Sequence, residues 1–307
     1  MTESGAHAAE LAIPRAEPRR FGRWRRDPWR KPRILATLTW AYLAWSILPV
    51  LIAILISFNA GRSNAQLQTL GLRWWLDDPV DHAALFQDPT LRRAILQTYL
   101  LSFLTMIIAV PIGVAFAIGI DRWRGRLATG ASFMMLLTFV MPEIIIGISM
   151  LLVIQYVFSF IHLGTTAQVI GLVTYQISYP VIIVRARLLS IGKEYEEAGM
   201  DLGATPQESV RRVLLPMLYP AIFASFAIVF ADTVDDFVTV SYLSGPSSST
   251  PLSLFVYTAV RASPTPAVNA AATLMLVTTT MAIAIGYVVY RRLSRGQRAD
   301  VAAFGQV

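Results

Sequence analysis

Two kinds of residue are scarce in this chain of 307 residues, and each scarcity excludes something. Cysteine is absent, so the chain has no disulfide framework, no thiolate metal site and no cysteine nucleophile. Charged residues make up only 15% of the chain and hydrophobic residues 55%, whereas a soluble domain carries about 25% charged residues. Such a chain has too little polar surface to cover itself in water. We therefore expect an integral membrane protein.

Catalytic motifs are missing as well. Lysine follows glycine only at Gly192-Lys193, and that pair lacks the rest of a phosphate-binding GxxxxGK[ST] loop. The histidines His7, His82 and His162 stand in separate segments without HExxH spacing, and no GxSxG elbow occurs. We therefore expect no enzyme activity, no bound metal and no other cofactor on this chain.

Six apolar runs contain few or no charged residues. A helix of about 20 apolar residues crosses a hydrocarbon core of about 30 Å. The third run contains Glu143 and is too long for one span yet too short for two, and the fourth run is the most polar. Together they predict an all-α fold with six transmembrane helices in a domain of residues 34–290. The runs are residues 34–58, 94–120, 127–161, 164–184, 217–243 and 267–290.

Basic residues separate the links between these runs into two groups. Residues 1–33 and the links after the second, fourth and sixth runs hold 21 Lys and Arg, whereas the other links hold 5. The positive-inside rule then predicts that both termini are cytoplasmic, as basic tails at 1–33 and 291–307. The net charge of +7 could also suggest nucleic-acid binding. Because the Arg residues flank apolar runs, we expect membrane lipid, and no nucleic acid, as the partner.

The link at residues 193–216 carries the signals of two short helices. Thr205 as N-cap, Pro206 at the first helical position and Glu208 three residues after the cap predict that a helix begins here. Gly203 predicts the left-handed turn that ends the helix before it, and Pro216 is expected to end the second helix. A bent pair of this kind on the cytoplasmic side would fit a socket on a partner protein.

This link resembles the coupling loop of ABC-importer permeases, whose motif reads EAA, three residues, G, nine residues, I, one residue, LP. The chain departs from it with Gly199 for the usual Ala and Val213 for Ile. The positions that align with the motif are Glu197, Ala198, Gly199, Gly203, Val213, Leu215 and Pro216. Asp201, which lies between them, is also expected to contribute to ATPase coupling.

The resemblance implies the ABC-importer permease fold, with six transmembrane helices and a cytoplasmic helix-turn-helix. It also implies a second permease subunit, two ATPase subunits that bind the ATP and Mg, and an external substrate-binding protein. The expected location is the cytoplasmic (inner) membrane of a prokaryote.

Acidic residues interrupt two of the apolar runs. Asp232, Asp235 and Asp236 are spaced i, i+3, i+4, which predicts that one helix face carries all three. At 1.5 Å per residue, Asp232 lies about 22 Å along its predicted helix and Glu143 about 24 Å along its own. Both helices are therefore expected to present acids at a similar height, near the outer mouth of the membrane domain.

Four acids at one height would repel one another unless a cation lies among them. A ligand with several ammonium groups would supply that cation, and Phe237 and Tyr242 could add cation–π contacts. Alternatively, the Asp cluster caps a helix end or pairs with Arg261. The polar side chains of the fourth run could line the same path or simply bond neighbouring helices. They are Gln168, Thr174, Tyr175, Gln176 and Tyr179.

Further strings are similar to the spermidine/putrescine branch of these permeases, in particular its C-type subunit. They include Asp235-Asp236-Phe237-Val238, Ser244-Gly245-Pro246 and Pro142-Glu143-Ile144. This resemblance implies a small cationic solute, a polyamine. Related branches for ferric iron, phosphonates or opines share the scaffold and remain alternatives. A secondary transporter or channel that uses the acids as a proton or cation relay is the alternative from a different class.

Overall fold

The computed structural model describes residues 33–64, 66–122, 125–262 and 265–304. The chain divides into two compact units, Met1–Leu51 and Ile52–Val307. Among the described residues the secondary structure is helical, apart from one isolated antiparallel bridge between Asn59 and Leu70. The predicted all-α fold is confirmed. The predicted basic tail at 1–33 lies outside the described residues except for Arg33.

Within the described residues, five helical segments are long and apolar enough to cross a membrane, and a bent helix pair makes a sixth candidate. The bent pair is α4 (Arg126–Val140) and α5 (Glu143–Tyr156), which meet at 108°. The five are α1 (Arg33–Ser57), α3 (Pro89–Arg122), α6 (Thr165–Gln176) with α7 (Ser178–Ile191), α9 (Pro206–Ser209) running through η2 (Val210–Leu214) into α10 (Leu215–Asp235), and α13 (Pro266–Phe304).

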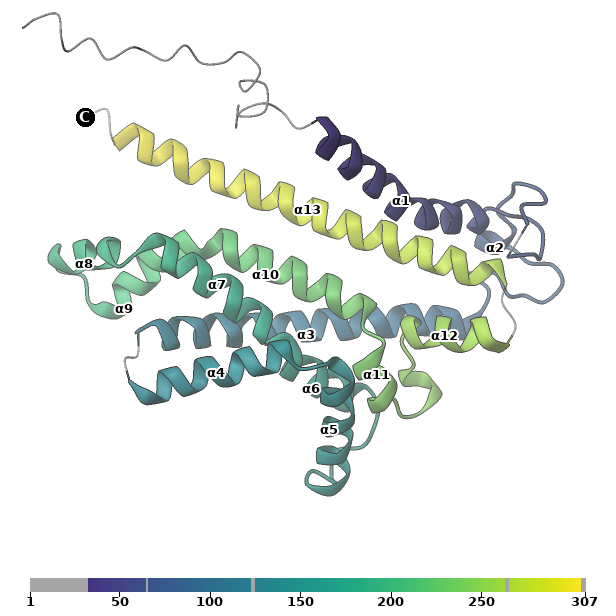
Figure 1. Ribbon diagram of the computed structural model, residues 1–307, viewed down its shortest axis with the longest axis horizontal. Helices are drawn as coiled ribbons and strands as arrows, with labels where there is room; N and C mark the ends of the chain where they lie inside the picture. Colours follow the sequence, from purple (N-terminus) through teal and green to yellow (C-terminus); the bar gives the residue numbers. More distant parts are fainter. Residues whose placement is uncertain (1–32, 65, 123–124, 263–264, 305–307) are drawn as a thin grey trace, which may run out of the picture. The chain divides into compact units, whose positions relative to one another are not determined.

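The bend between α4 and α5 explains the awkward length of the third apolar run (Figure 1). Met141 precedes Pro142 and takes an extended conformation, with φ −63° and ψ 137°. A residue before proline is pushed out of the α region, so α4 ends at Val140. A new helix then begins at Glu143, where a carboxylate is favoured by the helix dipole.

Helices α3, α7 and α10 pack against one another and form the main hydrophobic core (Figure 1). Val110, Val181 and Leu218, one from each helix, are fully buried there. Gly113 permits the close approach of α3 and α7, because a Cβ at this position would lie 2.4 Å from Pro180 Cγ. The bundle is thus built around small and branched apolar side chains.

Short elements lie at the two ends of this bundle (Figure 1). At one end are α8 (Glu194–Asp201) and α9. At the other are α11 (Val238–Leu243), η3 (Ser247–Ser249) and α12 (Leu252–Ala262), together with α2 (Arg73–Leu76). A second hydrophobic cluster joins Trp74 and Leu85 of this end to α3, α12 and α13.

Two sequence predictions about helix ends are wrong. Pro216 does not end the second coupling helix, because α9 continues through the π-helical η2 into α10. The N–H of Leu215 donates to the carbonyl of Val210, five residues earlier. This wider turn accommodates Pro216, which has no N–H to donate to the helix. The fifth apolar run is not one helix either, since α10 ends at Asp235 and α11 follows from Val238.

Candidate substrate path and coupling loop

The coupling loop, residues 193–216, turns between α8 and α9 as its sequence predicts. Gly203 has φ +92°, a left-handed conformation that other residues rarely adopt. Thr205 and Glu208 form the capping box: the Thr205 hydroxyl accepts from the Glu208 N–H at 3.3 Å, and the Glu208 carboxylate accepts from the Thr205 N–H at 3.1 Å. Both contacts satisfy N–H groups that have no partner within the helix.

Side chains of the coupling loop divide into an exposed and a packed set. Glu197, Ala198 and Asp201 are exposed on α8. Gly199, Val213, Leu215 and Pro216 are partly buried, and Gly199 faces α9, where a Cβ would lie 3.3 Å from Ser209 Oγ. The exposed set offers a surface to a partner, whereas the packed set holds the two short helices together.

Glu196 ties α8 to the transmembrane helices. Its carboxylate forms an ion pair with Arg122 at the end of α3, and its side chain is only 9% exposed. Its backbone carbonyl accepts a hydrogen bond from Ser209 Oγ at 3.0 Å. Sequence reasoning missed this pair, because 74 residues separate its members and no local motif joins them.

Two of the predicted acids, Glu143 and Asp232, are each hydrogen-bonded by side chains at the junction of α6 and α7. The Tyr175 hydroxyl donates to Glu143 Oε1 at 3.2 Å, and the Tyr179 hydroxyl donates to Asp232 Oδ1 at 3.4 Å. Gln176 Nε2 donates to Asp232 Oδ2 at 2.7 Å. The two tyrosine hydroxyls lie 3.5 Å apart. We call these five residues the carboxylate network.

The height estimate for Glu143 assumed one straight helix and is wrong, because α4 and α5 meet at 108°. The network nevertheless joins Glu143 of α5 to Asp232 of α10 through α6 and α7. Of the other polar side chains in the fourth run, Gln168 bonds Gln97, Ser244 and Ser249 and so links neighbouring elements. Thr174 bonds the carbonyl of Ile170 in its own helix.

The prediction that one helix face carries all three aspartates is wrong. Helix α10 ends at Asp235, and Asp236 is extended with φ −58° and ψ 119°. Asp236 is buried and accepts a hydrogen bond from the Val240 N–H at 3.2 Å, whereas Asp235 is exposed. The Asp236 carboxylate therefore satisfies an N–H in the first turn of α11, a role that the alternative interpretation gave to the whole cluster.

Phe237, the residue after Asp236, contacts an aromatic ring of α12. The ring of Phe237 lies 4.6 Å from that of Tyr257, and the Arg261 guanidinium lies 4.2 Å above the Tyr257 ring. Arg261 thus contacts an aromatic face, and in the described part of the chain it forms no ion pair with the acids. Tyr242 packs elsewhere, against Gly147 of α5.

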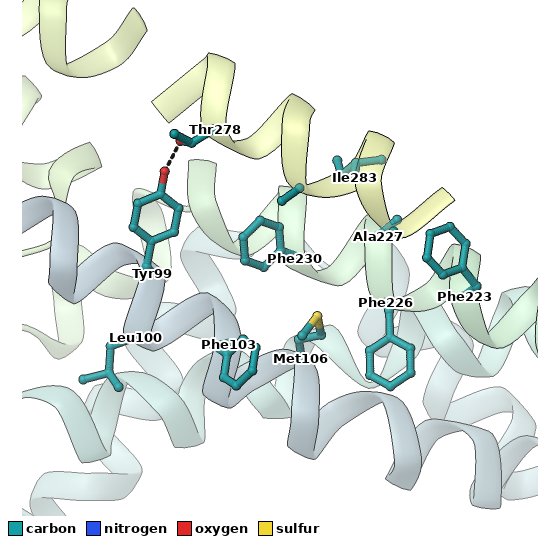
Figure 2. A pocket seen from close by; sticks show the side chains of 12 residues that line it. Tyr99, Leu100, Phe103, Met106, Phe223, Phe226, Ala227, Phe230, Thr278 and Ile283 are labelled. Carbon is teal, nitrogen blue, oxygen red and sulfur yellow. Dashed lines mark hydrogen bonds between the residues drawn. The ribbon is translucent and has the colours of Figure 1, made fainter. Parts of the chain in front are cut away.

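The described residues contain no group of three or more His, Asp or Glu that could hold a metal ion. A cavity of about 820 Å³ lies between α3, α10 and α13, and its wall is apolar, with Phe103, Phe226 and Phe230 on it (Figure 2). The hydroxyl of Tyr99 and that of Thr278 meet at one side of it. None of the predicted path residues lines this cavity, so it does not suit a hydrophilic cation.

The family of the chain follows from comparison with known sequences. Residues 83–299 match the model of the binding-protein-dependent transport system inner membrane component. The chain belongs to this family. Members of this family are inner-membrane permease components, so the multi-pass membrane character and the ABC-importer permease fold are confirmed.

Individual relatives of this permease are polyamine transport proteins. It is 28% identical to the putrescine transport system permease protein PotI of Escherichia coli (strain K12), over 90% of this chain and 94% of the relative. It is also 28% identical to the spermidine/putrescine transport system permease protein PotC of the same strain, over 85% of this chain and 95% of that one.

A solved structure shares the fold of this permease. It is a bacterial alginate ABC transporter in complex with an alginate pentasaccharide-bound periplasmic protein. The matched chain has a TM-score of 0.65 and 19% identity, with 85% of this permease and 93% of that chain covered. The match places the helices described above in the ABC-transporter permease architecture.

Proposed function

We propose that this permease carries a small organic cation, a polyamine, through the membrane as part of an ATP-driven importer. The observation that carries the proposal is the carboxylate network: Glu143 and Asp232 meet through tyrosine and glutamine donors, and no Lys or Arg of the described residues pairs with either. The similarity to PotI and PotC over most of the chain supports the same solute class.

The chemistry of the network suits an ammonium group. Carboxylates in a membrane domain are costly unless a cation or hydrogen bonds compensate them. Within the chain, the hydroxyls of Tyr175 and Tyr179 and the amide of Gln176 provide hydrogen bonds of this kind. Gln176 Oε1 is buried and has no hydrogen-bond partner in the described residues, so it is free to accept an N–H from a solute.

Further groups extend the proposed path beyond the network. Asp235 and Asp236 lie at the end of α10, where a second ammonium group of an extended diamine would find a carboxylate. The Phe237 ring contacts the Tyr257 ring at a tilt of 44°, and Tyr242 packs on α5. The aromatic faces would stabilise alkylammonium groups by cation–π contact.

ATP binding and hydrolysis are proposed to occur in partner subunits. Two ATPase subunits, with their ATP and Mg, would dock on the exposed face of α8, and a second permease would complete the path. The periplasmic protein in the alginate transporter supports an external substrate-binding protein here as well. This arrangement requires the coupling loop and both termini to face the cytoplasm.

Reconstitution of the complete transporter tests the solute class. Proteoliposomes containing both permeases and the ATPases, supplied with the cognate binding protein, would be offered labelled putrescine, spermidine, ferric iron, a phosphonate and an opine. We expect ATP-dependent uptake of one or both polyamines only. Uptake of another solute would overturn the polyamine assignment, and uptake without ATP would favour a secondary transporter or channel.

A second experiment tests the coupling loop separately from the solute. Gly203→Val places a branched side chain at φ +92°, and Glu197→Gln removes an exposed charge of α8. Both should reduce ATPase association in a pull-down and abolish uptake while membrane insertion is retained. Gly119→Val is the control, since Gly119 has open space around it. Normal ATPase binding by Gly203→Val would contradict the docking proposal.

A further inference from the structure

A groove separates α4 from α7 near the coupling-loop end of both helices. Its volume is about 410 Å³. Apolar side chains form most of its wall, among them Phe133, Leu136, Ile182 and Leu189, and Arg185 is its charged member. No acidic residue lines it.

Arg185 is the partly buried cation of this groove. Its side chain forms no hydrogen bond or ion pair with any of the described residues, and it is partly shielded from solvent. Its neighbour Arg187 differs, because Arg187 is exposed and hydrogen-bonds the Met217 carbonyl and Ser190 Oγ. Partial burial of a charge costs free energy unless an anion compensates it. An anionic group bound at Arg185 would therefore be stabilising.

The depth of the groove suits the boundary between lipid tails and headgroups. Arg185 stands six residues before the end of α7 at Ile191, and Ser132 of the groove stands six residues after the start of α4 at Arg126. Six residues of helix span about 9 Å. An arginine at this depth can extend its guanidinium to the interface while its methylene groups stay among apolar side chains.

The size of the groove distinguishes between two kinds of occupant. Two turns of a helix about 10 Å across fill roughly 850 Å³, which is about twice this volume. A transmembrane helix of a partner therefore could not lie wholly inside the groove, whereas a slender acyl chain could. Basic pockets between transmembrane helices are known sites for anionic lipid headgroups.

We propose that the groove between α4 and α7 binds an anionic phospholipid, with the phosphate at Arg185 and an acyl chain along Phe133 and Leu136. This site is separate from the solute path, because it shares no residue with the carboxylate network. A lipid bound in this groove would stabilise the packing of α4 on α7, on the N-terminal side of the bend at Pro142.

Native mass spectrometry of the complete transporter tests the site, with phosphatidylglycerol and phosphatidylcholine as the probes. We expect phosphatidylglycerol to be retained preferentially. Arg185→Gln should weaken its binding about fivefold, corresponding to about 1 kcal/mol for one basic residue near the surface. Leu136→Trp, which fills the groove without changing charge, should also displace it. Arg187→Gln is the matched control and should bind lipid as the wild type does.

Three outcomes would overturn the proposal. One is equal retention of the two lipids by the wild-type transporter. Another is an equal loss in the Arg185→Gln and Arg187→Gln variants, which would indicate a diffuse surface charge. The third is complete displacement by inorganic phosphate at the lipid's own concentration, which would leave no contribution from the acyl chain. Polyamine uptake is not needed for any of these measurements.

Discussion

The guanidinium of Arg122 lies against the carboxylate of Glu196, joining the end of α3 to α8 of the coupling loop. Helix α8 otherwise packs mainly on α9 and η2. Arg122 also pairs with its neighbour Asp121 at 2.9 Å. The ion pair therefore provides a lateral connection through which movement of the coupling loop can reach α3.

Removing the charge of Glu196 should weaken this connection. Loss of one member of a buried pair costs about 3 kcal/mol when the other charge is left alone. The cost should be smaller here, because Arg122 keeps its ion pair with Asp121. We expect Glu196→Gln to lower the thermal stability of the complete transporter and its binding-protein-stimulated ATPase activity several-fold. Glu194→Gln, an exposed acid in the same helix, is the control. The double exchange Arg122→Glu with Glu196→Arg should recover part of the activity. If the Glu196→Gln and Glu194→Gln variants behave identically, Glu196 has no specific role in coupling.

The ion pair between Arg73 and Asp78 should stabilise the segment between α1 and α3. The two side chains meet at 2.6 Å and Asp78 is fully buried. Breaking this pair with Arg73→Ala should cost about 3 kcal/mol. Arg62→Ala removes an equally short pair with Asp81 that is more than half exposed, and should cost less than about 1 kcal/mol. Equal thermal shifts for the two variants would contradict this difference.

Acid should destabilise the same segment. Burial raises the pKa of Asp78, but hydrogen bonds from Arg73 and from the N–H groups of Val80 and Asp81 outweigh it, so the pKa lies below its ordinary value of 3.8. A carboxyl group with a lowered pKa contributes stability above its ordinary value and loses it as the pH falls through the lowered one. We expect the stability difference between wild type and Asp78→Asn to shrink below pH 4, as measured by thermal unfolding.

Much of the fold could be predicted from local signals. Charge-free runs locate the transmembrane helices because an exposed charge is costly in lipid, and Thr205 with Glu208 locates a helix start because the cap satisfies free N–H groups. The positive φ of Gly203 follows from the need to turn between two helices. These features depend on residues close together in the sequence.

The missed features depend on competition between local signals and packing. Pro216 is an ordinary helix terminator, yet the π-turn of η2 lets the helix continue through it. Asp236 fits the helical spacing, but its carboxylate caps α11 after the chain has left α10. The links from Tyr175 to Glu143 and from Tyr179 to Asp232 need the tertiary fold, so the sequence could suggest polar path residues but not their pairing.

Two glycines should respond differently to alanine. A Cβ at Gly113 would lie 2.4 Å from Pro180 Cγ between α3 and α7, and such overpacking costs about 1–3 kcal/mol. A Cβ at Gly199 would lie 3.3 Å from Ser209 Oγ, so that Ser209 must shift by only a few tenths of an ångström. Alanine favours a helix by up to about 1 kcal/mol over glycine. We expect Gly113→Ala to lower the melting temperature and Gly199→Ala to keep or raise it. The reverse order in a thermal-stability assay would contradict the packing described.

Initial-rate uptake of labelled putrescine and spermidine tests whether the carboxylate network carries the cation. The complete transporter would carry Asp232→Asn or Glu143→Gln, with the exposed Asp81→Asn as the control. We predict at least a tenfold loss of uptake in the first two variants, with normal assembly and normal ATPase docking, and none in the control. Wild-type uptake kinetics in both network variants would show that the carboxylate network does not carry the cation.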